Sequence, residues 1–174
     1  NKAVEDINQG KIPDLDNPLN EVAKEINLHC SAIIPETYLP DVHHRLIFYK
    51  RLANTKTKNE IDALQVEMID RFGLLPEALK RLFEISALKL LCESHGLQTV
   101  EIGQERGKLV FADTTTIEPL SIVKLVQEDS NTYQFEGTST LITAHQLDSF
   151  EDRVQFLEEL INKLSNSSSE AGNA

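Results

Sequence analysis

The feature that most constrains the fold of this chain is the order of helix-starting and helix-ending signals between Ile33 and Pro76. The segment opens with IPETYLPD, whose two prolines favour an extended backbone. Asp41 directly follows the second proline and is a natural N-cap for a helix that ends near Asn54. The apolar face of this helix consists of Val42, Leu46, Ile47, Phe48, Tyr49, Leu52 and Ala53.

Two further helices are predicted directly afterwards. Thr57 and Glu60 have the S/T-x-x-E spacing of a capping box, and Gly73 is expected to end this second helix in left-handed backbone. Its apolar stripe is Ile61, Leu64, Met68 and Phe72. Pro76 fits the first turn of a third helix, which Gly96 ends. The apolar positions of the third helix are Leu79, Leu82, Phe83, Ser86, Leu90 and Leu91. The three helices are expected to pack as one subassembly.

Alternating patterns and shorter helices follow. Apolar residues alternate on both sides of Gln104–Gly107 and again around Gly137, which predicts two β-hairpins. Between them, Pro119 starts a short amphipathic helix. Its apolar positions are Leu120, Val123, Leu125 and Val126. A last helix carries Phe150, Val154, Leu157, Leu160, Ile161 and Leu164. The expected fold class is α+β, with a helical subassembly followed by β-hairpins packed with helices in a single compact domain.

The domain boundaries follow from composition. Residues 1–20 are interpreted as the end of a preceding helix and an interdomain connector, because a polar, proline-containing run follows Gly10. Residues 21–164 form the domain, which begins with a predicted strand over Glu21–Ala32 whose apolar side chains fall at even positions. Residues 165–174, SNSSSEAGNA, are predicted to be a disordered polar tail.

The charge balance favours a protein partner over nucleic acid. The chain has 17 basic and 28 acidic residues and a formal net charge of −11. Such a surface repels phosphate backbones, so no direct nucleic-acid contact is expected, and a basic protein surface is the expected partner. Neither cysteine has disulfide or zinc spacing, and no apolar run reaches the roughly 20 residues of a membrane span. No membrane association is expected, and the expected location is the cytoplasm.

No residue pattern predicts catalysis, a cofactor or a metal. His43 and His44 are adjacent, and neighbouring helical residues point about 100° apart, so this pair does not chelate one ion from one face. The sequence contains no phosphate-binding glycine loop and no nucleophile elbow. We therefore expect no catalytic, cofactor-binding or metal-binding residues.

Two charged helical segments remain as candidate contact surfaces. Positive charge gathers between His43 and Lys58. Its interleaved aromatic residues are expected to pack inward while the charges stay solvated or pair with Glu60 and Asp62. Negative charge gathers in the last helix, where only Arg153 and Lys163 oppose it. The candidate partner interface is Asp148, Glu151, Asp152, Glu158 and Glu159. For the acidic segment the alternative is a solvated helix face, and for the basic segment the alternative is contact with an acidic partner or phosphate.

The motifs YLPDVHHRLIFYKRLA and IDRFGLLPE, with the sequence around them from about Leu28 to Leu164, closely resemble the C-terminal domain of the bacterial transcription-repair coupling factors. The resemblance implies a non-catalytic regulatory domain of a large ATP-dependent DNA translocase, without the motor. In that family the domain acts as an autoinhibitory clasp on the N-terminal module that recruits the damage-recognition protein UvrA, and it restrains the motor until stalled RNA polymerase is engaged. The family has no catalytic residues in this domain to transfer.

Two other functions stay open at this point. An adaptor for nucleic acid or protein would use the basic helix at 43–58, and a hydrolase would need a fold that gathers histidines and carboxylates in one pocket. The sequence does not specify which face makes the clasp contact or whether the isolated domain dimerises.

Overall fold

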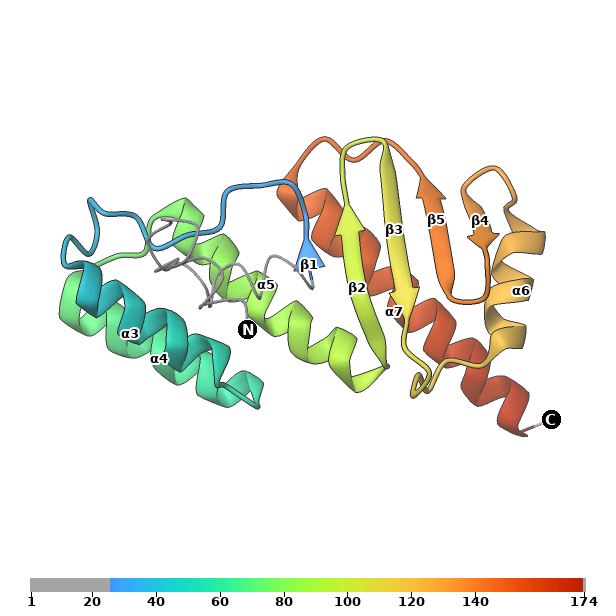
Figure 1. Ribbon diagram of the computed structural model, residues 1–174, viewed down its shortest axis with the longest axis horizontal. Helices are drawn as coiled ribbons and strands as arrows, with labels where there is room; N and C mark the ends of the chain where they lie inside the picture. The colour runs from blue at the N-terminus through green and yellow to red at the C-terminus, as the bar shows by residue number, and fades with distance from the viewer. Residues whose placement is uncertain (1–25, 174) are drawn as a thin grey trace, which may run out of the picture.

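The computed structural model describes the backbone of residues 26–173 and the side chains of residues 26–166. The predicted helix end and connector in residues 1–20 and the first five residues of the strand predicted over Glu21–Ala32 lie outside the described residues. Within them, five helices accompany one five-stranded mixed sheet in a single α+β domain (Figure 1). The helices are α3 (Val42–Ala53), α4 (Lys58–Phe72), α5 (Glu77–Ser94), α6 (Pro119–Glu128) and α7 (Phe150–Asn173). The strands are β1 (Ile26–Asn27), β2 (Leu97–Ile102), β3 (Arg106–Phe111), β4 (Tyr133–Glu136) and β5 (Thr140–Ala144). The fold class is as predicted.

Side-chain caps are present at the first turns of α3 and α4, at the residues that the sequence predicted. The Asp41 carboxylate accepts the His43 N–H at 2.8 Å, and the Thr57 hydroxyl accepts the Glu60 N–H at 3.2 Å. The second half of the capping box differs from expectation, because the Glu60 carboxylate accepts the N–H of Lys56 instead. Pro76 is the N-cap of α5 and lies one residue before its first turn. The three predicted helices are confirmed.

Gly73 ends α4 in a conformation other than the predicted left-handed helix. Its φ is 98° and its ψ is −171°, which is a region that only glycine occupies readily. Its N–H still closes the last turn on the Ile69 carbonyl at 2.9 Å. The extended ψ directs the chain away from α4 before α5 begins.

The sheet has the strand order β1-β2-β3-β5-β4. Both predicted hairpins are present, although the first loop is shorter than expected. The Gly103 N–H donates to the Arg106 carbonyl at 2.8 Å, so Gln104 and Glu105 alone form the loop, and Gly107 already pairs with Ile102. Strand β1 pairs in parallel with β2, a contact that the hairpin pattern did not predict.

Strand β1 ends at Asn27, five residues before the predicted end at Ala32. The Asn27 side chain accepts the His29 N–H at 2.9 Å, and His29 has a positive φ of 55°. This local turn competes with strand pairing and ends the extended segment. The predicted alternation is nonetheless visible, because Ile26 and Leu28 are both buried.

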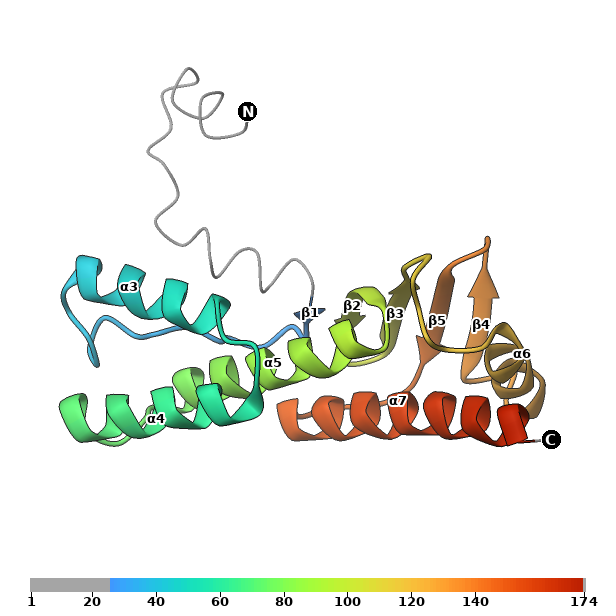
Figure 2. The ribbon, with the colours of Figure 1, turned by 90° about the horizontal axis from the view of Figure 1, so that it is seen from below.

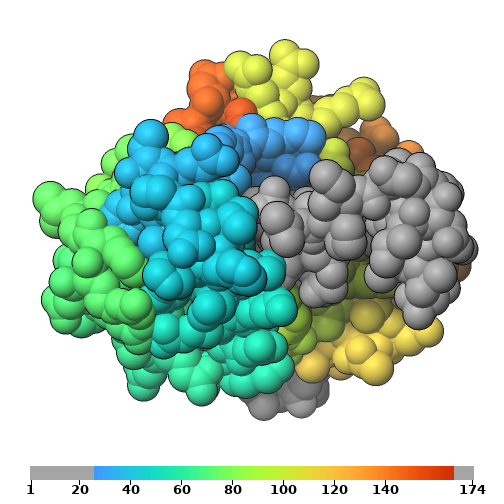
Figure 3. Space-filling model, turned by 60° about the vertical axis from the view of Figure 1, so that its left-hand side comes forward, coloured from blue at the N-terminus to red at the C-terminus, as the bar shows by residue number. Residues whose placement is uncertain are grey.

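Two buried clusters share α5. The helical core lies between α3, α4 and the first half of α5, and it includes Phe48, Leu64 and Phe83. The sheet core lies between the sheet, α6, α7 and the second half of α5. Figures 1 and 2 show α5 running from the helical end to the sheet, while α7 lies along one face of the sheet. Figure 3 views the helical end, where α3, α4 and the segment before α3 form one surface.

The last two helices differ from expectation in detail. In α6, Leu120 and Val123 were predicted to be apolar contacts but are 53% and 48% exposed. The helix buries the predicted Leu125 together with Ser121 and Ile122, which were not predicted. Apolar residues on both sides of α6 made its orientation ambiguous from periodicity. Helix α7 continues to Asn173, where the sequence predicted a disordered tail from residue 165, because no proline interrupts the run and helix propagation is cooperative.

Candidate functional site

The five predicted interface carboxylates are all exposed, but one of them lies outside the helix. Asp148 precedes α7, whose first turn is capped by Ser149 through a 3.0 Å bond from the Asp152 N–H. Asp148 accepts bonds from the side-chain amides of Gln104 and Gln146. These two bonds and the positive charge of Arg153 lower the pKa of Asp148. Asp148 therefore stays ionised at the end of the β2–β3 hairpin.

The four carboxylates of α7 form two separate stripes. Residues seven apart share a helix face, so Glu151 aligns with Glu158 and Asp152 aligns with Glu159. Glu151 and Glu158 are close enough to Glu84 of α5 to raise its pKa. The charge of Glu159 instead raises the pKa of Tyr133, at the other side of the helix. The structure thus brings together two of the five predicted residues with Glu84, and it does not bring all five into one set.

Glu84 is the acidic residue that the sequence reading missed. Burial is the largest cause of its raised pKa, followed by the negative charges of Glu151, Glu158 and Glu77. The only signal in the sequence is the seven-residue spacing from Glu77, which places both on one face of α5. Its proximity to α7 depends on tertiary packing and has no local signature.

Arg153 has a different role from the one expected. The sequence placed it among the surface charges that oppose the acidic helix, but it is only 7% exposed. Its guanidinium donates to the carbonyls of Leu28 at 2.8 Å and Leu147 at 3.1 Å, and it lies 3.3 Å from the Cys30 sulfur. Arg153 therefore joins the segment after β1 to α7, and the exposed carboxylates of α7 have less basic compensation on the surface than expected.

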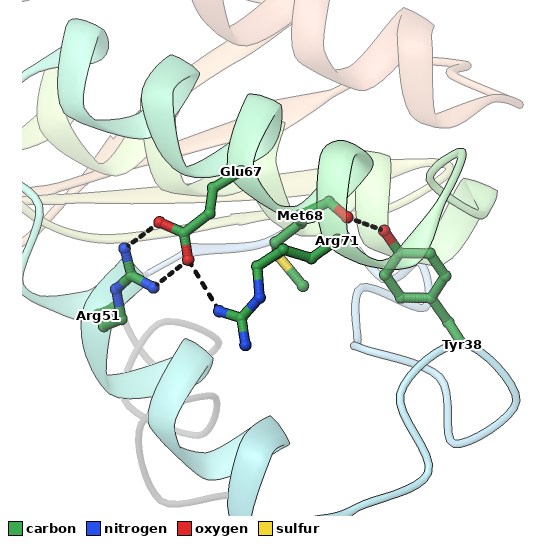
Figure 4. Close-up of polar contacts among 5 residues, drawn as sticks. All are labelled: Tyr38, Arg51, Glu67, Met68 and Arg71. Carbon is green, nitrogen blue, oxygen red and sulfur yellow. Dashed lines mark hydrogen bonds and ion pairs between the residues drawn. The ribbon is translucent and has the colours of Figure 1, made fainter.

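Several charges of the basic segment are paired within the domain, as expected, but Arg51 pairs with Glu67 and not with the predicted Glu60. Arg51 makes a bidentate ion pair with Glu67 at 2.6 and 2.7 Å, and Arg71 reaches the same carboxylate at 3.1 Å (Figure 4). These contacts lower the pKa of Glu67 to about 2, with the Arg51 hydrogen bond as the largest cause. Both guanidinium groups lie over the Phe48 ring, at 5.1 and 5.4 Å.

Two other cations of the same segment also have bonding partners within the domain. Arg45 donates to the carbonyls of Leu39 and Pro40 at 2.8 and 2.9 Å, and Lys58 pairs with Asp62. The segment thus holds α3, α4 and the preceding loop together, which leaves less free positive charge for a phosphate backbone.

The described residues contain no group of three or more histidine, cysteine or acidic side chains that could hold a metal ion. His43 and His44 are exposed at the start of α3. Cys92 is buried, and this burial raises the pKa of its thiol to about 12, so the thiol is protonated and unreactive at neutral pH. In the described part of the chain, no helix has the length and apolar character needed to cross a bilayer.

Comparisons with known proteins agree with the motif resemblance. The TRCF domain family profile matches residues 28–122. The transcription-repair-coupling factors of Haemophilus influenzae and Escherichia coli are 35% and 31% identical to this chain, over 91% and 93% of its length. The chain spans 14% of the length of each of these relatives.

A solved structure titled as the C-terminal domain of transcription-repair coupling factor shares the fold. Its TM-score is 0.67 at 23% identity, over 84% of this chain and 94% of that chain. The family match covers α3, α4, α5 and the first hairpin, which carry the capping and packing features described above. The chain therefore belongs to the TRCF domain family and is homologous to the C-terminal region of transcription-repair coupling factors.

Proposed function

We propose that this domain is the non-catalytic, autoinhibitory clasp of a transcription-repair coupling DNA translocase. In this role it packs on the N-terminal module of the same polypeptide, masks the surface that recruits UvrA, and restrains the ATPase motor. Engagement of stalled RNA polymerase releases it. The proposal rests on membership of the TRCF domain family and extends the role of that family to this chain.

The structural observation that supports the proposal is the exposure of all five predicted carboxylates, which lie in two stripes on α7 and at Asp148 beside it. The proposed contact surface is Asp148, Glu151, Asp152, Glu158 and Glu159. Because Arg153 is turned into the core, this surface attracts a basic face of a partner module. An interface based on exposed charge is modest in affinity and sensitive to salt, which suits a contact that must be released.

Adding the domain in trans to a parent translocase that lacks it tests the proposal. We expect the domain to lower both the ATPase rate and the binding of UvrA in about 50 mM salt, and the effect to weaken as salt rises. The variant Asp152→Lys with Glu159→Lys should suppress less, because it reverses both charges of the Asp152 and Glu159 stripe. Full-strength UvrA binding and ATPase at saturating domain concentration would contradict the proposal.

The alternative of an adaptor that works through the basic helix receives less support. Arg45, Arg51 and Lys58 each make ion pairs within the domain. A DNA mobility shift that is lost on charge reversal of Arg45 and Lys50 would favour the adaptor.

A further inference from the structure

An open groove lies along one side of α5, between α4 and α7. It has a volume of about 330 Å³. Figure 2 shows α4 and α7 on the same side of α5, with the first turns of the two helices nearest each other. The floor of this α5 groove is Ala87, Leu88 and Leu91, and Val154 of α7 adds an apolar wall. Leu91 lies four positions after Ala87 and three after Leu88, so the three residues share one face of α5. The volume is within the range of about 300–1,000 Å³ that binding pockets occupy.

The edges of the α5 groove are acidic. Glu84 of α5 and Glu158 of α7 line it. Glu151 is near enough for its negative charge to raise the pKa of Glu84. The one lining cation, Lys58, forms an ion pair with Asp62 of its own helix, and its charge offsets the repulsion at Glu84 only in part. The raised pKa of Glu84 reflects burial together with repulsion from these neighbouring carboxylates. A cation that entered the groove would relieve this repulsion.

We propose that the α5 groove is the docking site for an amphipathic helix of a partner protein. The helix presents apolar side chains to the floor and lysine or arginine to Glu84 and Glu158. Helix-in-groove recognition requires an apolar channel with charges at its edges. The α5 floor supplies the apolar channel, and Val154 and Glu158 of α7 and the first residue of α4 flank it. Because the groove is short, the expected dissociation constant is roughly 1–100 μM. This role goes beyond the autoinhibitory one, because the occupant belongs to another protein and binds without the parent translocase.

The probe is a fluorescein-labelled peptide of roughly 18 residues, long enough to form a helix on binding. It has leucines at three- and four-residue spacing and flanking lysines and arginines. A second peptide of the same composition has the leucines scrambled. We expect the patterned peptide to bind the 174-residue chain at about 150 mM salt at least tenfold more tightly than the scrambled one, measured by fluorescence anisotropy.

Two neighbouring charge reversals separate groove binding from general attraction to an acidic domain. Glu158→Lys and Glu159→Lys change the net charge equally, but only Glu158 lines the groove. We expect Glu158→Lys to weaken binding about tenfold, equivalent to about 1.4 kcal/mol, and Glu159→Lys to weaken it less than twofold. Equal losses for the two variants, or equal binding of the two peptides, would overturn the proposal.

NMR shift mapping on the unmodified chain tests the same site without any substitution. The patterned peptide should shift the backbone amide signals of residues 84–91 and 154–158. Shifts confined to another surface would exclude the groove, even if a variant failed to fold. The trans assay for autoinhibition reads a different interaction, because its Asp152→Lys and Glu159→Lys variant leaves the groove residues unchanged. Failure of one proposal is thus distinguishable from failure of the other.

Discussion

At the scale of single residues, Arg153 has the clearest structural role. It is buried, and it donates to two backbone carbonyls from different parts of the chain. Arg153→Ala leaves these acceptors without their donor in a low-dielectric site, so we expect a loss of about 2–3 kcal/mol in the free energy of unfolding. Urea denaturation followed by circular dichroism measures it.

The matched control for this prediction is Lys163→Ala, which removes a cation from an exposed position of the same helix. We expect a change within about 0.5 kcal/mol. Arg153→Lys should recover only part of the loss, because an ammonium group lacks the planar fork that reaches both carbonyls. If Arg153→Ala and Lys163→Ala cost the same, Arg153 does not stabilise the junction.

A second residue-scale prediction concerns pH. The pKa of Glu67 is lowered from 4.5 to about 2 by Arg51 and Arg71, so its ionised form stabilises the folded state. This contribution is complete above pH 4.5 and is lost as the pH falls toward 2. Because Glu67 is about one third exposed, solvent screening limits the contribution to roughly 0.5–1 kcal/mol.

The substitution Glu67→Gln tests the pH dependence. The difference in unfolding free energy between the unmodified chain and this variant should be present at pH 7 and shrink between pH 4.5 and pH 2. Asp62→Asn, which removes an exposed pair with Lys58, is the control. A difference that stays constant down to pH 2 would show that the ion pair is not its source.

At the scale of elements, two glycines end helices for different physical reasons. Gly73 has a φ of 98° but open space around the position of a Cβ, so its substitution strains only the backbone. Gly96 has a φ of 71°, and a Cβ there would lie 2.3 Å from the Thr115 Cα. We expect Gly73→Ala to cost about 1–2 kcal/mol and Gly96→Ala to cost more, by chemical denaturation. Equal losses of unfolding free energy for the two variants would mean that the loop at Thr115 can move away from the added Cβ without a penalty.

The elements also show what a sequence can predict. Asp41 and Thr57 were found from the sequence because a cap contacts residues only two or three positions away. The pairing of β1 with β2 was not found, because it joins residues separated by three helices and leaves no periodic signal in either strand. The missed roles of Glu84 and Arg153 have the same origin. Each depends on how α7 packs, and each looks locally like a surface charge on an amphipathic helix.

At the scale of the whole molecule, α5 is expected to couple the two cores. Phe83 belongs to the helical core, whereas Ile85 and Leu88, a few residues later on the same helix, belong to the sheet core. Leu157→Ala removes a fully buried side chain from the sheet core and should cost about 2–5 kcal/mol. Because α5 is continuous, we expect this loss to lower amide protection in α4 as well as in β5.

Native-state hydrogen exchange measures the coupling. Leu64→Ala, in the helical core, is the reciprocal variant, and it should lower protection in β5 by a similar amount. Val66→Ala, at a position of α4 that is 58% exposed, should lower neither. Faster exchange restricted to the half that carries the substitution would show that the two cores unfold independently.

The bond from Arg153 to the Leu28 carbonyl also has a consequence for the order of synthesis. It spans 125 positions, so the Leu28 carbonyl can accept this hydrogen bond only after α7 has been synthesised. The buried and partly buried residues of the helical core lie within residues 32–90, so this core is synthesised well before α7. A nascent chain would thus have a folded helical core while the apolar face of its sheet is still exposed. Helix α7 covers that face last and so protects it from aggregation.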